Sequence, residues 1–312
     1  MVGGWQTSMV TSQTITAAAA GTWTLGDLTV NRMGFGAMRL TSDADGTPSD
    51  RGRAIAVLRR AVELGVNHID TAAFYFSPLR SANELINRAL APYPDDLVIT
   101  TKVWPGRDPS GEWAWASPGQ LRGQVEENLR QLGRDYLDVV NLRMPRSQET
   151  ASLAEHFGAL ASLRDAGLIR HLGISNVRPK HLAEAQSIAP VVCVQNSYGI
   201  GASAEKRDLV RACGEQGVAF VPFFAIAGAA GAGAGAGASG ASVSGEGGEV
   251  LAMARAHGAT EAQVRLAWTL QQGAHVLAIP GTGNPDHLAA NVAAGALRLS
   301  ADEMARLDAV VG

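Results

Sequence analysis

Residues 64–70 read LGVNHID, and this short stretch contains the unit from which the fold is built. A helical segment ends at a glycine, and a β-rich run follows within a few residues. Glycine suits the position after a helix because it adopts the left-handed backbone conformation that ends many helices. The same order recurs at Gly133, Gly167, Gly217 and Gly273. The runs are apolar with little alternation, which is typical of parallel strands buried on both faces.

Eight segments of this kind are candidate strands, and their starts lie about 35 residues apart, with a helical segment between them. They are Arg32–Gly36, Val66–Asp70, Leu97–Lys102, Tyr136–Arg143, Ile169–Ser175, Val191–Gln195, Val218–Phe223 and Val276–Pro280. Eight strand–helix units predict an α/β fold, the (β/α)8 or TIM barrel. A doubly wound open sheet is the competing architecture. Residues 22–30 predict a short N-terminal β-hairpin that covers the floor of the barrel.

Length and charge narrow the class of protein. The chain has 312 residues, enough for one large domain or two average ones. Its 26 lysines and arginines against 29 acidic residues give a net charge of −3, which argues against a nucleic-acid partner. Cys193 and Cys213 are too few for a disulfide framework or a metal cluster. We therefore expect no bound metal and a reducing, cytoplasmic setting.

The ends and one internal segment differ from the rest in composition. No stretch reaches the ~18 uninterrupted apolar residues of a membrane helix, so we expect no membrane partner. Residues 1–21 lack the charged and apolar regions of a signal peptide and are interpreted as a disordered leader. Residues 22–312 then form a single domain. Within it, the Gly/Ala-rich segment 227–248 is expected to be a loop after the seventh strand.

In a barrel of this type, the functional site forms at the carboxyl ends of the strands. Reading those ends gives Asp70, Lys102, Arg143, Ser175, Asn176, Gln195, Phe223 and Thr282. Tyr75 follows Asp70 by five residues. The polar residues are concentrated at these ends although the strands themselves are apolar, and packing alone does not explain that.

Tyr75, Lys102, Asp70 and Arg143 together suit proton transfer to a carbonyl group. A tyrosine hydroxyl has a reference pKa near 10, and a nearby ammonium or guanidinium group lowers such a pKa. Asp70 would hold Lys102 in position. Each residue alone also has an ordinary explanation: a lysine reaching solvent, an aspartate capping a loop, a tyrosine packed on the rim, or an arginine in an ion pair. The sequence lacks an HExxH zinc motif, a GxSxG nucleophile turn and a Walker phosphate loop, which disfavours other barrel chemistries.

These residues belong to motifs that resemble those of the aldo-keto reductases in their order and intervals. The motifs are DTAAFY at 70–75, TK at 101–102, GISN at 173–176, QN at 195–196 and IP at 279–280. The resemblance covers nearly the whole chain, from about Thr22 to Ala309. Within the family, DVVNLR at 138–143, VCVQN at 192–196, VPFF at 221–224 and IPGT at 279–282 look like the bacterial pyridoxal-reductase branch.

The resemblance implies a reductase that binds NADPH in an extended form across the barrel mouth, with NADH left open. Tyr75 would be the general acid, with Lys102 tuning its pKa and Asp70 holding Lys102. The nicotinamide carboxamide would be held by Ser175, Asn176 and Gln195. Phe223 would stack on the nicotinamide, at a position where the family usually has a tyrosine. The further cofactor contacts that the resemblance implies are Gly36, Phe224, Ile226, Thr282, His287 and Asn291.

The chain departs from the family's usual pattern in three respects. Arg143 stands in place of the usual catalytic histidine. An arginine stays protonated and cannot act as a general acid, but it can polarise a carbonyl oxygen or hold an anionic or phenolic substrate group. Gly281 and His287 stand where the family has a lysine and an arginine that bind the cofactor phosphate. Phe76 replaces a common glycine and narrows the mouth beside Tyr75.

The loops after the strands supply a candidate substrate pocket, formed by Phe74, Phe76, Trp104, Trp113, Trp115 and Met144. Its aromatic rings favour a flat aromatic aldehyde, pyridoxal included, although some of the tryptophans could instead cover the rim. The expected function is therefore NADPH-dependent reduction of an aldehyde or ketone to an alcohol, as in an oxidoreductase of the alcohol dehydrogenase type. The alternative is a cofactor-binding regulatory or redox-sensing protein with little turnover, which Arg143 keeps open. We expect a monomer whose partner is a small carbonyl substrate.

Overall fold

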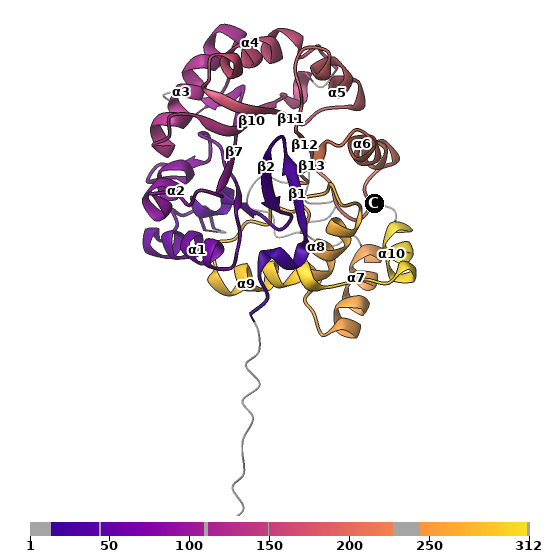
Figure 1. Ribbon diagram of the computed structural model, residues 1–312. Coiled ribbons are helices and arrows are strands. Elements are labelled where there is room, and N and C mark those ends of the chain that lie inside the picture. The colour runs from indigo at the N-terminus through magenta and orange to yellow at the C-terminus, as the bar shows by residue number, and fades with distance from the viewer. Residues whose placement is uncertain (1–13, 44, 109–111, 149, 227–243, 311–312) are drawn as a thin grey trace, which may run out of the picture.

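The computed structural model describes residues 14–43, 45–108, 112–148, 150–226 and 244–310. Strands from both halves of the chain surround a common axis, and helices form the outer layer (Figure 1). Sequential strands lie beside one another, because each is followed by a helix that returns the chain to the start of the next.

Seven parallel strands form one sheet in the order β13-β12-β11-β10-β7-β4-β3. They are β3 Phe35–Gly36, β4 His68–Asp70, β7 Val98–Val103, β10 Leu137–Arg143, β11 Ile169–Ser175, β12 Cys193–Gln195 and β13 Ala219–Phe220. Residues 276–280 lie between the two edge strands. There Leu277 N donates to Phe220 O at 2.9 Å, and Gly34 N donates to Ala278 O at 2.8 Å. These bonds close the sheet, and the predicted α/β barrel is confirmed.

The helices lie where the sequence pattern places them, between the strands. They are α1 Arg51–Glu63, α2 Ala82–Leu90, α3 Leu121–Leu132, α4 Ala154–Asp165, α5 Pro179–Gln186, α6 Ala204–Glu215, α7 Ser244–His257, α8 Glu261–Gln271, α9 Pro285–Ala293 and α10 Ala301–Asp308. Short 3-10 helices occur at Ala17–Ala20, Ala37–Leu40, Pro118–Gln120, Arg146–Gln148 and Ala294–Ala296. Within the described ranges, no helix combines the length and the apolar character needed to cross a membrane.

Glycines end four of the helices in the expected way. The glycines after α1, α3, α4 and α6 have φ values of 81°, 63°, 81° and 67°. Gly273 after α8 differs, because its φ is not in the left-handed region. A Cβ at Gly273 would lie only 2.5 Å from the His275 ring. The interpretation of Gly273 as a left-handed helix end is therefore wrong, and the close approach of the imidazole is what requires glycine there.

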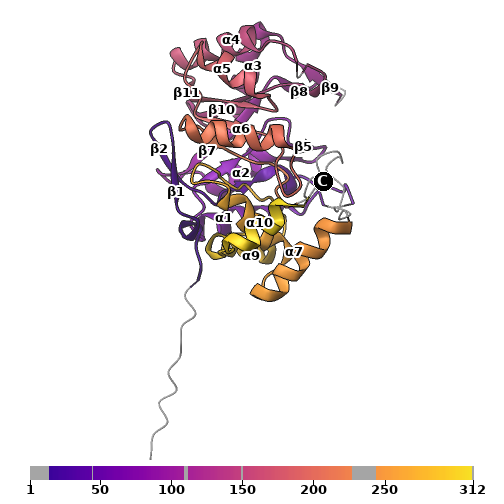
Figure 2. The same cartoon turned by 90° about the vertical axis from the view of Figure 1, so that its right-hand side faces the viewer.

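A β-hairpin seals the amino-terminal end of the barrel. Strand β1, Thr22–Leu25, pairs antiparallel with β2, Leu28–Asn31, which confirms the predicted hairpin. Leu25 and Val30 are fully buried against apolar side chains of the barrel interior. Two hairpins that the sequence did not predict stand at the opposite end (Figure 2). One joins β5, Phe76–Ser77, to β6, Arg80–Ser81, and the other joins β8, Pro105–Arg107, to β9, Trp113–Trp115.

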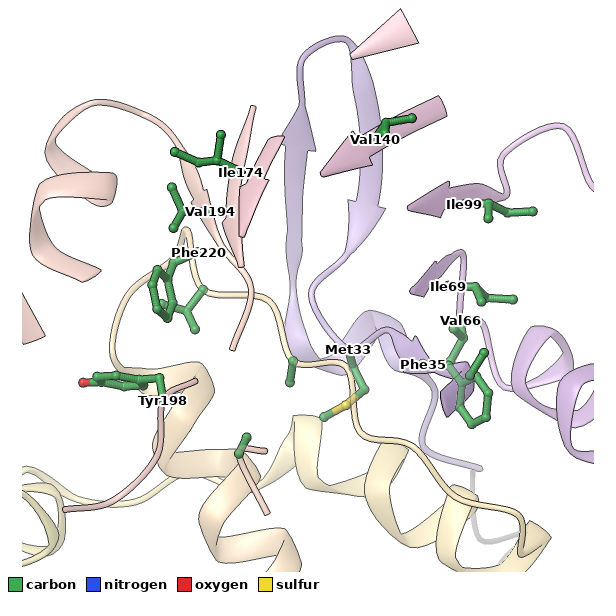
Figure 3. Close-up of a cluster of buried hydrophobic side chains, with 14 of the residues drawn as sticks. Met33, Phe35, Val66, Ile69, Ile99, Val140, Ile174, Val194, Tyr198 and Phe220 are labelled. Atoms are coloured by element: carbon green, nitrogen blue, oxygen red, sulfur yellow. The ribbon is translucent and has the colours of Figure 1, made fainter. Parts of the chain in front are cut away.

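The two faces of the strands carry different side chains. Ile69, Ile99, Val140, Ile174 and Val194 are buried in a large apolar cluster that includes residues of the surrounding helices (Figure 3). Because side chains alternate along a strand, the residues next to these point to the inner face. Near the carboxyl ends of the strands, those inner residues are polar, so the helices are held by apolar contacts while the barrel mouth keeps its polar groups.

Residues 17–21 have a defined structure, although the sequence predicted disorder up to residue 21. Ala17 N donates to Leu64 O at 2.8 Å, and Ala17 and Ala20 are buried. The expectation of a disordered leader is therefore wrong for residues 17–21, because small side chains allow the 3-10 helix to pack closely against Gly295. Residues 1–13 lie outside the described residues. Of the expected loop 227–248, residues 227–243 also lie outside them, and residues 244–248 belong to α7.

Acid should destabilise the fold through His68, which is fully buried in the barrel with Nε2 3.1 Å from Thr100 Oγ1. Burial lowers the pKa of His68 from 6.5 to about 4. The unfolded chain therefore binds the proton more tightly, and stability present above pH 6.5 is lost as the pH falls toward 4. By pH 4.5 this loss is about 2.5 kcal/mol. In urea unfolding, the free energy of unfolding of His68→Gln should fall by about 2.5 kcal/mol less than that of the wild type when the pH is lowered from above 6.5 to 4.5.

The matched control is His287→Gln, which changes an exposed histidine of α9. It should follow the wild-type dependence on pH. An equal acid sensitivity in His68→Gln and the wild type would contradict the assignment to His68.

Candidate active site

Lys102 and Asp70 form a buried ion pair at the carboxyl ends of β7 and β4. Lys102 Nζ donates to Asp70 Oδ1 at 2.8 Å, to Asp70 Oδ2 at 2.7 Å and to the Thr71 carbonyl at 2.9 Å. Lys102 is 2% exposed and Asp70 is 3% exposed. An ammonium group has three protons to donate, and a lysine can remain buried only when it is paired. The lysine side chain is therefore withdrawn from solvent, and Asp70 and Thr71 together hold its ammonium group.

Gln195 joins this pair from the other side of the barrel. Gln195 Nε2 donates to Asp70 Oδ1 at 2.6 Å. Gln195 ends β12, and three strands separate β12 from β4 in the sheet order. The contact therefore exists only because the sheet curves round, and it brings together two residues that are 125 positions apart in the chain.

Tyr75 lies beside the lysine, on the loop that follows β4. Lys102 Nζ is 4.8 Å from the centroid of the Tyr75 ring. The loop is held by Tyr75 N, which donates to the Ala72 carbonyl at 3.0 Å, and by Ala82 N, which donates to the Tyr75 carbonyl at 2.9 Å. Within the described residues, the Tyr75 hydroxyl has no hydrogen-bond partner. A half-buried phenol next to a fixed cation is thus left with its proton available to a ligand.

Arg143 ends β10 and supplies a second cation at the same end of the barrel. Its guanidinium carbon lies 5.0 Å from the centroid of the Phe223 ring. Arg143 is half-buried, and in the described part of the chain it has no hydrogen-bond or ion-pair partner. Its strand pairs with β11 so that Arg143 is opposite Ser175. A partly dehydrated guanidinium without a counter-ion favours the approach of an anionic or strongly polarised oxygen.

At the ends of β11 and β12, two buried side-chain atoms are without a hydrogen-bond partner in the described residues. They are Ser175 Oγ and Gln195 Oε1. Ser175 on β11 is opposite Gln195 on β12 in the parallel register. A hydroxyl can donate and an amide oxygen can accept, so the two atoms are complementary to a carboxamide, which offers one acceptor and one donor group. Leaving a buried polar atom unpaired costs about 1–3 kcal/mol, which favours a ligand that pairs both.

Asn176 is held in place by its neighbours. It adopts a left-handed conformation with φ of 60°, and Asn176 Nδ2 donates to the Met144 carbonyl at 2.8 Å. Its backbone N donates to the Gln195 carbonyl at 3.0 Å. Asparagine tolerates this conformation better than most residues. These bonds fix the turn after Ser175. The side-chain nitrogen of Asn176 already donates a hydrogen bond within the protein.

Phe223, Phe224 and Ile226 follow β13 at the same mouth. The rings of Phe223 and Phe224 meet edge to face with centroids 5.2 Å apart, and Phe224 has φ of 63°. All three side chains are half-buried. The Phe223 ring, with Arg143 near it, offers an aromatic surface at the mouth. The Gly/Ala-rich residues that follow Ile226 lie outside the described residues.

Aromatic side chains line the rim beside Tyr75. Phe74 meets Tyr75 edge to face at 5.1 Å and Trp113 at 5.6 Å, and Trp113 stacks on Trp115 at 6.2 Å. A cavity of about 880 Å³ opens here, between the two unexpected hairpins and helices α2 and α3. Phe74, Phe76, Trp115 and Lys102 line it, whereas Tyr75, Arg143 and Trp113 do not. The aromatic wall therefore borders a cavity that lies beside the Tyr75 loop.

Two predicted pocket residues are more deeply buried than the other four. Trp104 is 2% exposed and stacks on His156 with ring centroids 3.9 Å apart. Met144 is also buried, and neither side chain lines the cavity. The assignment of Trp104 and Met144 to the substrate pocket stays a prediction, as does that of Trp113. The β8–β9 hairpin turns back over the end of β7, where Ala116 N donates to the Trp104 carbonyl at 2.9 Å, and this covers the indole.

The remaining predicted cofactor residues lie around the start of α9 and the end of β3. Thr282 Oγ1 accepts from Asn284 N at 3.0 Å just before the helix. His287 is exposed on α9, and Asn291 is buried one turn further on. At Gly36, a Cβ would lie 2.7 Å from the Ile279 carbonyl, so the close approach of the chain requires glycine.

Arg39 is a residue that the sequence analysis missed. It belongs to the 3-10 helix after β3 and is half-buried. A Cβ at Gly281 would lie 3.7 Å from Arg39 Cγ, so this arginine lies beside Gly281, the position at which the resemblance implies a lysine. The available signal was a basic residue three positions after Gly36 at a strand end. No group of three or more His, Cys, Asp or Glu residues in the described ranges is placed to hold a metal ion.

A model of the Aldo/keto reductase family matches residues 32–311 of this sequence. The chain belongs to the aldo/keto reductase family. It is 41% identical over 298 residues to pyridoxine 4-dehydrogenase of Escherichia coli, covering 94% of this chain and 99% of that protein. The family that the motifs indicated is thus confirmed.

Solved structures of aldo/keto reductases share the fold. A thermostable aldo-keto reductase in complex with the inhibitor epalrestat has a TM-score of 0.73 at 30% identity, covering 90% of this chain and 95% of that one. An aldo/keto reductase from Klebsiella pneumoniae in complex with NADP and acetate has a TM-score of 0.70 at 27% identity, with coverage of 90% and 91%.

The buried ion pair of this aldo/keto reductase should be strongly non-additive toward substitution. Asp70→Asn leaves the Lys102 ammonium without a counter-charge, and Lys102→Met leaves the Asp70 carboxylate without one. Each should lower the free energy of unfolding by about 3–5 kcal/mol. The double variant should be less destabilised than the sum of the two, because it leaves neither charge buried. Denaturant unfolding of the three variants measures this.

An exposed pair provides the control. Arg122 and Glu126 on α3 are 3.5 Å apart and more than half exposed. Arg122→Ala should change the free energy of unfolding by less than about 1 kcal/mol. Strictly additive losses at Lys102 and Asp70 would contradict a coupled buried pair.

Proposed function

We propose that this protein reduces an aldehyde or ketone to an alcohol with NADPH as its cofactor. The observation that carries the proposal is the Tyr75 hydroxyl, which has no hydrogen-bond partner among the described residues and lies beside the buried Lys102–Asp70 pair. A lone buried ion pair needs no phenol next to it for stability. A phenol with an available proton, held near a fixed ammonium, is suited to protonate a carbonyl oxygen as the oxygen gains negative charge.

The mouth of the barrel fits a nicotinamide group. Ser175 Oγ and Gln195 Oε1 supply the donor and the acceptor that a carboxamide needs. Phe223 offers a ring face for stacking, and Asn176 orders the turn between these residues. When bound, the nicotinamide supplies the hydride that reduces the carbonyl carbon. The NADP-bound relative from Klebsiella pneumoniae supports this cofactor for the family.

Each catalytic residue then has one task. Tyr75 gives its hydroxyl proton to the carbonyl oxygen. Lys102 holds its ammonium group 4.8 Å from the centroid of the Tyr75 ring, beside the residue that gives up the proton. Asp70 keeps Lys102 in position, and the contact of Gln195 with Asp70 links the proton-donating side of the site to the cofactor side.

Arg143 acts as a fixed charge and not as an acid. Because a guanidinium remains protonated, it can orient the carbonyl oxygen or hold a second, anionic oxygen of the substrate, but it cannot supply the proton. Its contact with Phe223 places this charge at the aromatic surface proposed for the cofactor. The substitution of histidine by arginine is therefore compatible with turnover, provided that Tyr75 is the proton donor.

We further propose an aromatic aldehyde as the substrate class, pyridoxal being one example. Phe74, Trp113 and Trp115 present ring faces and edges beside Tyr75, and flat rings bury apolar area well against such a wall. The name of the Escherichia coli relative, pyridoxine 4-dehydrogenase, supports a substrate of this shape.

Removal of the Tyr75 hydroxyl tests the assignment of the acid. Tyr75→Phe should lower kcat for pyridoxal or benzaldehyde about 10²- to 10⁴-fold, because the proton donor is lost. NADPH affinity, followed by cofactor fluorescence, should stay within twofold. Tyr136→Phe is the control, because Tyr136 is exposed next to the amino end of β10.

The outcomes separate the two functions. Full turnover by Tyr75→Phe would contradict the catalytic assignment. If the wild type bound NADPH tightly but reduced none of the aldehydes, the regulatory alternative would replace the proposal.

We propose that Arg39 supplies the cation that binds the cofactor phosphate, because Gly281 has no side chain that could do so. NADPH differs from NADH by one phosphate, which an arginine binds with charge-assisted hydrogen bonds. Arg39→Gln should therefore weaken NADPH binding about tenfold and leave NADH binding within twofold, as measured by fluorescence titration with both cofactors. Arg122→Gln on α3 removes a distant exposed arginine and should change neither affinity. Equal losses for NADPH and NADH would contradict a phosphate contact.

A further inference from the structure

A pair of fully buried asparagines lies directly behind the ion pair, between the sheet and the helices. Asn83 is in the first turn of α2 and Asn128 is in α3, and both are 0% exposed. Asn83 Nδ2 donates to Asn128 Oδ1 at 3.0 Å. Thr71 Oγ1 donates to Asn83 Oδ1 at 2.7 Å, and Thr101 Oγ1 donates to Asn128 Oδ1 at 2.6 Å.

The two threonines connect these amides to the residues of the ion pair. Thr71 follows Asp70 in the chain, and its carbonyl accepts from Lys102 Nζ at 2.9 Å. Thr101 precedes Lys102, so its hydroxyl faces the helices while the lysine faces the barrel. The Thr71 hydroxyl therefore fixes the same residue whose carbonyl holds the ammonium group. The Thr101 hydroxyl holds the residue that directly precedes Lys102 in β7.

The same bonds close the loop that carries Tyr75. Thr71 and Asn83 stand at the two ends of residues 71–83, and their side-chain bond joins those ends. Tyr75 lies within this segment, where its carbonyl accepts from Ala82 N at 2.9 Å. The asparagine pair is thus hydrogen-bonded to the segments that carry the Tyr75 ring and the Lys102 ammonium. The distance between the ammonium nitrogen and the ring centroid is 4.8 Å.

Every polar atom of the two amides is used. Asn83 Nδ2 also donates to Gln131 Oε1 at 3.0 Å, and Asn128 Nδ2 donates to the Gln124 carbonyl at 2.9 Å. Asn128 Oδ1 accepts two hydrogen bonds, which is the capacity of an amide oxygen. Apolar residues of similar volume would fill this space without the desolvation of two amides. A fully satisfied network restricts the geometry more than apolar packing does.

We propose that Asn83 and Asn128 are positioning residues for the reaction, acting through the hydroxyls of Thr71 and Thr101 to hold Lys102 against Tyr75. This inference rests on the proposed function, because it gives the positioning its purpose. It assigns a catalytic consequence to a cluster that is bonded to the ion-pair segments through Thr71 and Thr101, and of which Asn128 also lines the cavity of about 880 Å³.

Thr71→Val gives the sharpest test, because it removes one hydroxyl and keeps both the β-branched shape and the carbonyl that accepts from Lys102. We expect kcat for an aromatic aldehyde to fall at least tenfold, with KM and NADPH affinity within twofold. Thr71→Ser, which restores the hydroxyl, should recover most of kcat. Thr101→Val should show the same split, and it replaces Thr71→Val if that variant fails to fold.

Asn87→Ala is the matched control. Asn87 is one turn along α2, and its Nδ2 donates to the Gln131 carbonyl at 3.3 Å, so the variant removes an α2–α3 hydrogen bond that does not reach the strands. Its kcat should equal that of the wild type. Thermal unfolding of all variants shows whether any change in kcat follows from lost stability alone.

A second readout does not depend on turnover. The ¹⁵N–¹H signal of the buried Lys102 ammonium, identified by its absence in Lys102→Met, should be sharp in the wild type and in Asn87→Ala. It should broaden in Thr71→Val. An unchanged kcat together with an unchanged ammonium signal in Thr71→Val would overturn the inference. A wild type that reduces no carbonyl compound would contradict the proposed function, while the ammonium signal would still test the positioning.

Discussion

An ammonium group removed from water has to find acceptors for all three of its protons, and Lys102 finds them in Asp70 and Thr71. Taking the two charges out of water costs several kcal/mol per ion, so the arrangement persists only where its geometry is nearly fixed. The geometry of the ion pair therefore depends on several strands of the barrel. The strands β4 and β7 must be neighbours in register, and the sheet must curve enough for Gln195 on β12 to reach Asp70. An open sheet with the same strand order would hold these two residues apart.

The barrel meets this requirement by separating its polar and apolar groups along the axis. At the amino-terminal end, Leu25 and Val30 of the hairpin complete an apolar plug. At the carboxyl-terminal end, buried atoms such as Ser175 Oγ have no hydrogen-bond partner in the described part of the chain. The outer faces of the same strands pack against helices, with the asparagine pair as a polar exception. The stability of the fold and the position of the reactive groups therefore depend on different faces of the same strands.

Much of this was predictable, because the signals are local in the chain. Apolar runs, glycines after helices and polar residues at strand ends predict the barrel and bring Asp70, Tyr75 and Lys102 to one edge. What the sequence could not predict depends on tertiary packing. Trp104 is covered because the β8–β9 hairpin folds back over it and His156 stacks on it. Asn128 could have been noticed, because it interrupts the buried stripe of α3. Its partner on α2, however, is set by helix packing alone.

Arg143 stands where the resemblance to the family implies a histidine, and this difference changes how charge is distributed in the proposed reaction. Lys102 is paired with Asp70, whereas Arg143 has no counter-ion among the described residues. An imidazole titrates near pH 6.5 and can either give a proton or lose its charge, whereas a guanidinium does neither in the physiological range. In the proposed reaction, Tyr75 would then supply the mobile proton, and Arg143 would supply a permanent charge that Asp70 does not neutralise. A substrate that carries its own ionised oxygen beside the carbonyl would be attracted equally at pH 6 and at pH 8, which a histidine at this position would not achieve.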